Sequence, residues 1–131
     1  ALACDIMLVA DNAKLADTHA KFGIRPTWGM TQRLPQAVGI ARARELSYTA
    51  RTISGIEAAE IGLAARSAAL ESFPEALQQL IDEILPNSSE SFVAYKDLYR
   101  EQLPADDGLA REYGTDYPFS DDTNVRLADF R

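Results

Sequence analysis

Apolar residues open the chain in one nearly continuous run and alternate with polar residues just after it. Residues 2–10 are almost entirely apolar, which is typical of a short buried strand. Residues 11–12 then predict a turn, and residues 14–19 alternate enough to predict a second short extended segment. This alternation places Asp17 and His19 on one face, because successive side chains of a strand point to opposite sides.

The pattern becomes irregular over residues 23–29 and helical afterwards. Proline and glycine flank Trp28 in that segment, which predicts a shaped loop without regular structure. We expect Thr31 to cap a short helix that continues through Leu34 and is interrupted at Pro35.

The rest of the chain carries repeated signals for helices. They predict helices at residues 40–49, 55–61, 77–85 and 107–113. Two further helices are predicted, one from the start signal at Asn87 to about Glu101 and one from Ser120 onward. A short strand is predicted at residues 63–67. Ser54 with Glu57, and Ser72 with Glu75, have the spacing of a capping box, in which both side chains bind otherwise unpaired backbone amides.

Two of these helices carry marked apolar faces. At residues 77–85, leucines and isoleucines recur with the spacing of one buried helical face, and Pro86 ends the helix. Three aromatic residues of the next helix form a stripe that we assign to the core or to a subunit interface rather than to a cofactor site, namely Phe92, Tyr95 and Tyr99.

The composition is that of a soluble globular protein of domain size, with 131 residues, 47% apolar and 25% charged. The net charge of −7 argues against nucleic acid as a partner. No apolar run approaches the about 20 residues of a membrane span, so no membrane segment is expected. Because Ala1 replaces the usual methionine and opens directly inside an apolar run, we expect the chain to be a piece of a longer one.

Cys4 is the only cysteine, so an internal disulfide and a zinc cage of several thiolates are excluded. A cytoplasmic location fits this usage. The apolar neighbours of Cys4 predict a buried and inert thiol. The sequence has no GxGxxG, P-loop or HExxH motif, so neither a cofactor nor a metal is expected.

The stretch from Ala13 to Gly39 holds the residue types that favour chemistry. His19 is the only histidine, and Trp28 is the only tryptophan. An imidazole changes charge near neutral pH, and a nearby carboxylate such as Asp17 fixes its tautomer and raises its basicity. Two interpretations stay open: a catalytic histidine oriented by Asp17, or a structural histidine beside an aspartate that caps a turn.

Several short motifs, taken in order, resemble the C-terminal part of the crotonase superfamily, the enoyl-CoA hydratases and isomerases. The resemblance covers nearly all of the 131 residues. Thr-Gln-Arg-Leu follows a loop with proline and glycine, and the pattern Ile-Ser-x-x-x-Ala-x-x-x-Gly-Leu follows the next helix. The residues that show the resemblance are Ala1 to Ile6, the stretch that begins at Ala13 and ends at Leu34, Gly39, Thr49 to Ser54, Ala58, Ala59, Gly62 and Leu63.

The resemblance implies an α/β fold. The chain would form the C-terminal part of a crotonase-type ββα spiral (ClpP/crotonase-like), followed by C-terminal helices. This fragment would be mostly helical. It assigns residues 1–70 to the end of the spiral core with an active-site loop. Residues 71–131 become a helical region that covers CoA and contacts other subunits. A homotrimer or a dimer of trimers is expected.

The implied substrate is a fatty acyl-CoA thioester, with CoA as part of the substrate rather than a cofactor. Hydration of a 2-enoyl-CoA through an enolate is the leading reaction. The alternatives are an isomerase, dehalogenase or thioesterase reaction, or a non-catalytic acyl-CoA-binding or assembly module. In such proteins the backbone donors for the thioester oxygen and the first catalytic glutamate would precede Ala1, so the chain by itself is expected to be inactive.

The resemblance also assigns individual site residues. His19 stands where typical hydratases have their second catalytic glutamate, and an imidazole transfers a proton much as a carboxylic acid does. Pro26, Trp28 and Gly29 would line the loop beside the acyl chain, with Gly29 permitting a close approach of backbones. For Trp28 the alternative is a side chain that fills the core under the loop.

Two further residues are assigned by position. Arg33 is expected to be a structural ion-pair partner rather than a substrate ligand. Phe130 aligns with an aromatic residue near CoA across a subunit boundary. The basic residue that follows it in the family is absent here, unless Arg131 replaces it.

Overall fold

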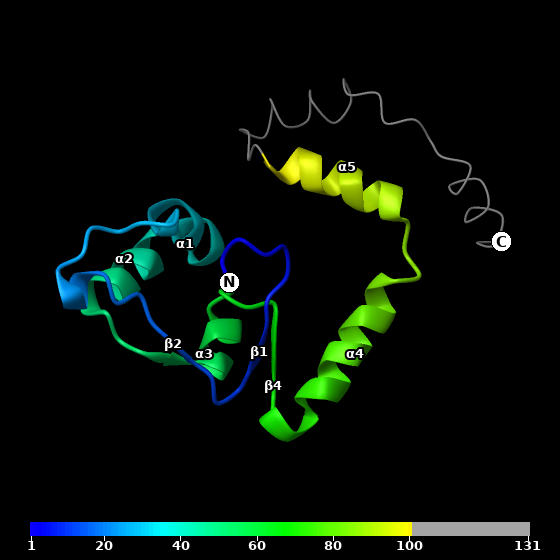
Figure 1. Cartoon of the computed structure of the whole chain (residues 1–131), viewed down its shortest axis with the longest axis horizontal. Coiled ribbons are helices and arrows are strands. Elements are labelled where there is room, and N and C mark those ends of the chain that lie inside the picture. Colours follow the sequence, from blue (N-terminus) through cyan, green and yellow to red (C-terminus); the bar gives the residue numbers. More distant parts are fainter. Residues whose placement is uncertain (101–131) are drawn as a thin grey trace. The chain divides into compact units, whose positions relative to one another are not determined.

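The computed structural model describes residues 1–100 of the chain (Figure 1). Contacts divide the chain into two compact units, Ala1–Leu80 and Ile81–Arg131. The predicted boundary at residue 70 stays a prediction. The helices expected at residues 107–113 and from Ser120 onward lie outside the described residues.

The first unit contains two small two-stranded sheets (Figure 1). One is parallel and the other antiparallel, and each joins segments far apart in sequence. Strand β1 (Leu8–Ala10) pairs with β4 (Arg66–Ala68), and β2 (Lys14–Leu15) pairs with β3 (Ile53–Ser54).

All three predicted strands differ in extent from the observed ones. The run at residues 2–10 forms a strand only in its last three residues, because only these pair with β4. The segment at residues 14–19 is paired only at its first two positions, and the strand expected at residues 63–67 lies at residues 66–68. Apolar character predicted burial in a sheet, but the ladder partners decided the ends of each strand.

Cys4 lies in the irregular segment before β1. Its backbone N–H donates to the carbonyl oxygen of Ala1 at 3.0 Å, and its side chain is exposed with a free thiol. The prediction of a buried thiol is therefore wrong, because the residue lies in a turn and not in a buried strand.

Helices cover most of the remaining first unit. They are η1 (Ala20–Phe22), α1 (Met30–Val38), α2 (Ile40–Thr49), α3 (Gly55–Glu60) and η2 (Leu70–Ser72). The bounds of α2 are those predicted, and α3 ends one residue early. Ser54 caps α3 as predicted, because its Oγ accepts the Glu57 backbone N–H at 3.1 Å.

Helix α1 is longer than predicted and passes through Pro35 without interruption. Proline removes only its own N–H from the ladder, and its carbonyl still accepts the Gly39 N–H at 2.9 Å. Leu34 is only 5% exposed, so the apolar face of α1 anchors the helix to the core. Gly29 and not Thr31 is the N-cap residue, and no side chain caps this helix.

The core is small and joins helices and strands of the first unit. Gly55 lets the start of α3 lie close to the backbone at the end of β1, because a Cβ at this position would collide with the carbonyl oxygen of Ala10. The buried apolar residues are Val9, Leu34, Ala43, Leu46, Ile53, Ala58 and Ala64.

Two longer helices follow, α4 (Phe73–Ile84) and α5 (Ser89–Arg100). The helix predicted at residues 77–85 is present, but its apolar face is not buried: Leu77 is 42% exposed and Leu85 is 73% exposed. Tyr95 and Tyr99 of α5 stack with ring centroids 5.7 Å apart and are also exposed. Amphipathic spacing predicted these helices, but it did not determine what covers them. No helix among residues 1–100 is long and apolar enough to cross a membrane.

Candidate functional site

Asp17 and His19 form a buried pair at the start of η1. Asp17 Oδ1 lies 2.6 Å from His19 Nδ1, and the two residues are 7% and 8% exposed. The same oxygen accepts the backbone N–H of His19 at 3.2 Å, which is the hydrogen bond of an Asx turn. Asp17 therefore both caps a turn and orients the imidazole.

The contact between these residues was predicted for the wrong reason. His19 has helical backbone angles, φ −56° and ψ −49°, and β2 ends at Leu15. Strand alternation therefore does not bring the side chains together. They meet because the short Asp17 side chain accepts the backbone N–H of the residue two positions later.

Ser47 completes the pair from helix α2. Its Oγ donates to Asp17 Oδ2 at 2.7 Å across 30 residues of sequence. Ser47 was not among the site residues predicted from the sequence. A signal was present, because Ser47 lies one turn after the buried Ala43 and so shares the core-facing side of α2.

The hydrogen bonds determine the charge state of Asp17. Burial raises the pKa of its carboxyl group, but hydrogen bonds from His19 and Ser47 together lower it further, so the net pKa lies below the ordinary value. An ionised Asp17 accepts hydrogen bonds only. His19 therefore carries its proton on Nδ1 when neutral, and Nε2 presents a lone pair.

The loop at residues 25–29 covers Nε2 of His19. The Thr27 backbone N–H donates to Nε2 at 3.4 Å, and Thr27 Oγ1 lies 3.5 Å from the same atom. The Trp28 ring lies against the imidazole, with centroids 5.6 Å apart and a tilt of 50°. Trp28 is 86% exposed, so it does not fill the core, and that alternative is wrong.

The conformation of this loop is unusual and is held by Arg33. Trp28 has φ 54°, in the left-handed region that favours glycine. Arg33 Nη1 donates to the Trp28 carbonyl oxygen at 2.6 Å. Arg33 therefore holds the loop through a carbonyl group, and the ion pair expected for it is not formed among residues 1–100. Gly29 makes room for this guanidinium rather than for a backbone, because a Cβ there would collide with it.

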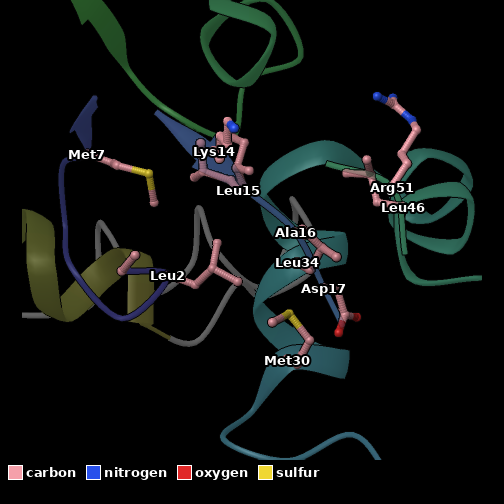
Figure 2. A pocket seen from close by; sticks show the side chains of 12 residues that line it. Leu2, Met7, Lys14, Leu15, Ala16, Asp17, Met30, Leu34, Leu46 and Arg51 are labelled. Atoms are coloured by element: carbon pink, nitrogen blue, oxygen red, sulfur yellow. The ribbon is translucent and has the colours of Figure 1, made fainter. Parts of the chain in front are cut away.

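A cavity of about 300 Å³ lies next to Asp17 (Figure 2). Its walls are mostly leucine, methionine and alanine side chains, with three charged residues among them. Pro26, Trp28 and Gly29 do not line it, and Pro26 is exposed. Phe130 lies outside the described residues. The lining residues are Ala1, Leu2, Met7, Lys14, Leu15, Ala16, Asp17, Met30, Leu34, Leu46, Arg51 and Leu63.

A second charged cluster, which the sequence analysis also missed, joins α2 to α3. Arg51 Nε lies 2.6 Å from Glu45 Oε1, and Arg51 Nη2 lies 2.6 Å from Glu57 Oε1. Hydrogen bonds from the guanidinium lower the pKa of both glutamates, and those glutamates raise the pKa of Arg51. Among residues 1–100 no three His, Cys, Asp or Glu side chains gather into a group that could hold a metal ion.

The sequence and the fold both match known proteins. Residues 1–121 match the family described as enoyl-CoA hydratase/isomerase. The rat mitochondrial methylglutaconyl-CoA hydratase is 39% identical over 107 residues, which cover 79% of this chain and 29% of the rat protein. The short-chain-enoyl-CoA hydratase of Clostridioides difficile is 38% identical over 88 residues, which cover 67% of this chain and 57% of that protein.

Solved structures agree with this match. A Bacillus anthracis enoyl-CoA hydratase superimposes with a TM-score of 0.81 at 34% identity, covering 86% of this chain and 45% of that one. A Thermobifida fusca protein solved in complex with CoA gives 0.78 at 30% identity, covering 98% and 48%. The chain thus spans less than two thirds of each of these relatives. The predicted crotonase-type fold is confirmed, and the chain belongs to the enoyl-CoA hydratase/isomerase family.

Proposed function

We propose that the protein containing this chain binds a fatty acyl-CoA thioester and hydrates a 2-enoyl-CoA through an enolate. Family membership and the hydratase names of its relatives support this reaction class. The complex of the Thermobifida fusca relative with CoA supports a CoA thioester as substrate. His19 is the proposed proton-transfer group.

The observation that carries the proposal is the hydrogen bonding of His19. Its Nδ1 is engaged by Asp17 at 2.6 Å, so Nε2 is the nitrogen that can take a proton from water or give one to the α-carbon. In hydration, an O–H bond of water and the π bond between the α- and β-carbons break, a C–O bond forms at the β-carbon, and a C–H bond forms at the α-carbon. The thioester oxygen holds the enolate charge between these steps.

A second candidate function also has a specific observation in its favour. Nε2 accepts the Thr27 backbone N–H at 3.4 Å, which makes His19 an anchor for the loop at residues 25–29. In that case the protein binds acyl-CoA or assembles with other subunits without turnover.

Replacing His19 separates the two candidates. In the full protein, His19→Gln keeps a polar side chain but removes the base, so we expect the turnover of a 2-enoyl-CoA to fall by at least about tenfold. Lys21→Gln changes an exposed residue of η1, two positions after His19, and serves as the matched control, for which we expect unchanged turnover. CoA binding and thermal unfolding of each variant show whether the site and the fold are retained.

Each outcome has a clear meaning. An unchanged rate in His19→Gln removes the imidazole from the mechanism. CoA binding without turnover in the unmodified protein favours the non-catalytic module, and rapid hydration eliminates it.

We further propose that the protein assembles as a trimer or a dimer of trimers. The exposed apolar side chains of α4 and α5 support a role in protein contacts. Light scattering of the full protein tests this, since a monomer mass would exclude it.

A further inference from the structure

We infer that Ser47 is a positioning residue: its hydroxyl fixes the carboxylate of Asp17 and thereby selects the tautomer of His19. The effect on turnover rests on the proposed function. The effect on the imidazole does not, because it follows from the hydrogen bonds alone.

The two carboxylate oxygens of Asp17 accept hydrogen bonds from different donors. Oδ1 receives both donors of His19, the ring Nδ1 at 2.6 Å and the backbone N–H at 3.2 Å. Oδ2 receives the Ser47 hydroxyl at 2.7 Å. Each oxygen therefore has a donor from a different part of the fold, so the carboxylate is held at both ends and cannot rotate about its Cβ–Cγ bond without breaking a bond.

The donors to Asp17 differ in their distance along the chain. The His19 donors are local and would follow any movement of residues 17–19. Ser47 lies on α2, 30 residues away, and α2 carries the buried Ala43 and Leu46. Ser47 thus ties the Asx turn to the core, which local hydrogen bonds do not do.

The state of the Asp17 carboxylate decides which ring nitrogen of the neutral His19 imidazole carries the proton. A hydroxyl donor on Oδ2 stabilises the ionised form of Asp17, in agreement with the lowered pKa of this carboxyl group. An ionised and fixed carboxylate accepts the Nδ1 proton and leaves Nε2 as the base. Without Ser47, Asp17 can turn away from Nδ1. Only the long contact of the Thr27 N–H with Nε2, at 3.4 Å, then favours the Nδ1–H tautomer, so the second neutral tautomer, with its proton on Nε2, becomes populated.

A merely structural serine would behave differently. Alanine has a higher helix propensity than serine, and this gain partly offsets the lost hydrogen bond in Ser47→Ala. The stability of this variant is therefore a poor test, and the tautomer of His19 is a direct one.

The test uses nitrogen NMR of histidine-labelled full protein, with the His19 signals assigned by their loss in His19→Gln. We expect the unmodified protein to show the Nδ1–H tautomer and Ser47→Ala to show a mixture of both tautomers. Ser47→Thr restores the hydroxyl and the single tautomer. Tyr48→Phe removes a hydroxyl from the neighbouring residue, which is 77% exposed, and should leave the spectrum unchanged.

Turnover of a 2-enoyl-CoA by the same variants completes the test. We expect kcat of Ser47→Ala to fall by about fivefold, the size of one lost hydrogen bond, and Ser47→Thr to recover it. A single unchanged tautomer in Ser47→Ala would overturn the positioning role, whatever happens to the rate. A tautomer mixture with unchanged rates in both Ser47→Ala and His19→Gln would support the positioning role and reject the proposed function.

Should Ser47→Ala fail to fold, Ser47→Cys offers a weaker donor of similar size. Because a thiol is a weaker donor than a hydroxyl, we expect Ser47→Cys to show the second tautomer in a smaller fraction than complete loss of the donor would give. A spectrum identical to that of the unmodified protein would contradict the inference.

Discussion

Two clusters of charged and polar side chains are anchored on helix α2, and they differ mainly in burial. The first joins Asp17, His19 and Ser47, and the second joins Arg51 to Glu45 and Glu57. The shortest distance is 2.6 Å in both clusters. The side chains of Asp17 and His19 are 4% and 9% exposed, whereas those of the second cluster are 32% to 36% exposed.

The comparison teaches that bond length alone does not reveal what a cluster does. Water can replace a broken partner in the half-buried cluster of Arg51, Glu45 and Glu57, so each of its ion pairs contributes less net stability than a fully buried pair. In the buried cluster a lost partner leaves a donor or a charge without water, which is costly. Fixed geometry therefore belongs to the buried cluster, and that is where proton transfer would benefit from it.

The largest expected effect comes from removing the shared acceptor of the buried cluster. Asp17→Ala leaves the His19 ring, the His19 backbone N–H and the Ser47 hydroxyl without their partner. We expect the free energy of unfolding to fall by about 3 kcal/mol, measured by urea denaturation of the full protein. Asp17→Asn keeps the shape and one acceptor and should lose less. Equal losses in both variants would mean that the hydrogen bonds are not the cause.

Acidification should give an intermediate effect. Because the pKa of Asp17 is lower in the folded state than the about 3.9 of an unfolded chain, its contribution to stability is present above that value. The contribution is lost as the pH falls through the folded pKa. Glu45 and Glu57 act in the same direction, since their pKa values are also lowered.

Denaturation at a series of acidic pH values, with and without added salt, separates the two clusters. Salt screens the half-buried pairs of Arg51 more than the buried pair of Asp17 and His19. Unfolding free energy should therefore fall less steeply below about pH 4 in Asp17→Asn than in the unmodified protein, even in high salt. Identical slopes in both proteins would show that Asp17 does not contribute.

The smallest expected effect comes from the half-buried cluster. Arg51→Met keeps the aliphatic part of the side chain but breaks both ion pairs to Glu45 and Glu57. The denaturation midpoint should fall less than in Asp17→Ala, and the difference should shrink at about 1 M salt. A larger loss than in Asp17→Ala would reverse the ranking of the two clusters.

The sequence predicted a good part of the fold, where the signals were local. The bounds of α2 and the Ser54 cap of α3 follow from residues within one or two helical turns of each other. The contact of Asp17 with His19 was also predicted, although by way of a strand that is not there. In contrast, the exposure of Trp28 and of Cys4 followed from loop and turn geometry that neither residue type reveals.

The sequence by itself determined the bounds of α2, the presence of α3, α4 and α5, and the closeness of Asp17 to His19, because each depends on residues near one another along the chain. It also revealed the family, through short motifs in a fixed order. Only the tertiary structure decided the strand ends, the cavity beside Asp17 and the hydrogen bond from Ser47. These depend on partners as far as 30 residues away, which meet only when α2 packs against the core. The selection of one imidazole nitrogen as the base is therefore a property of the packed fold.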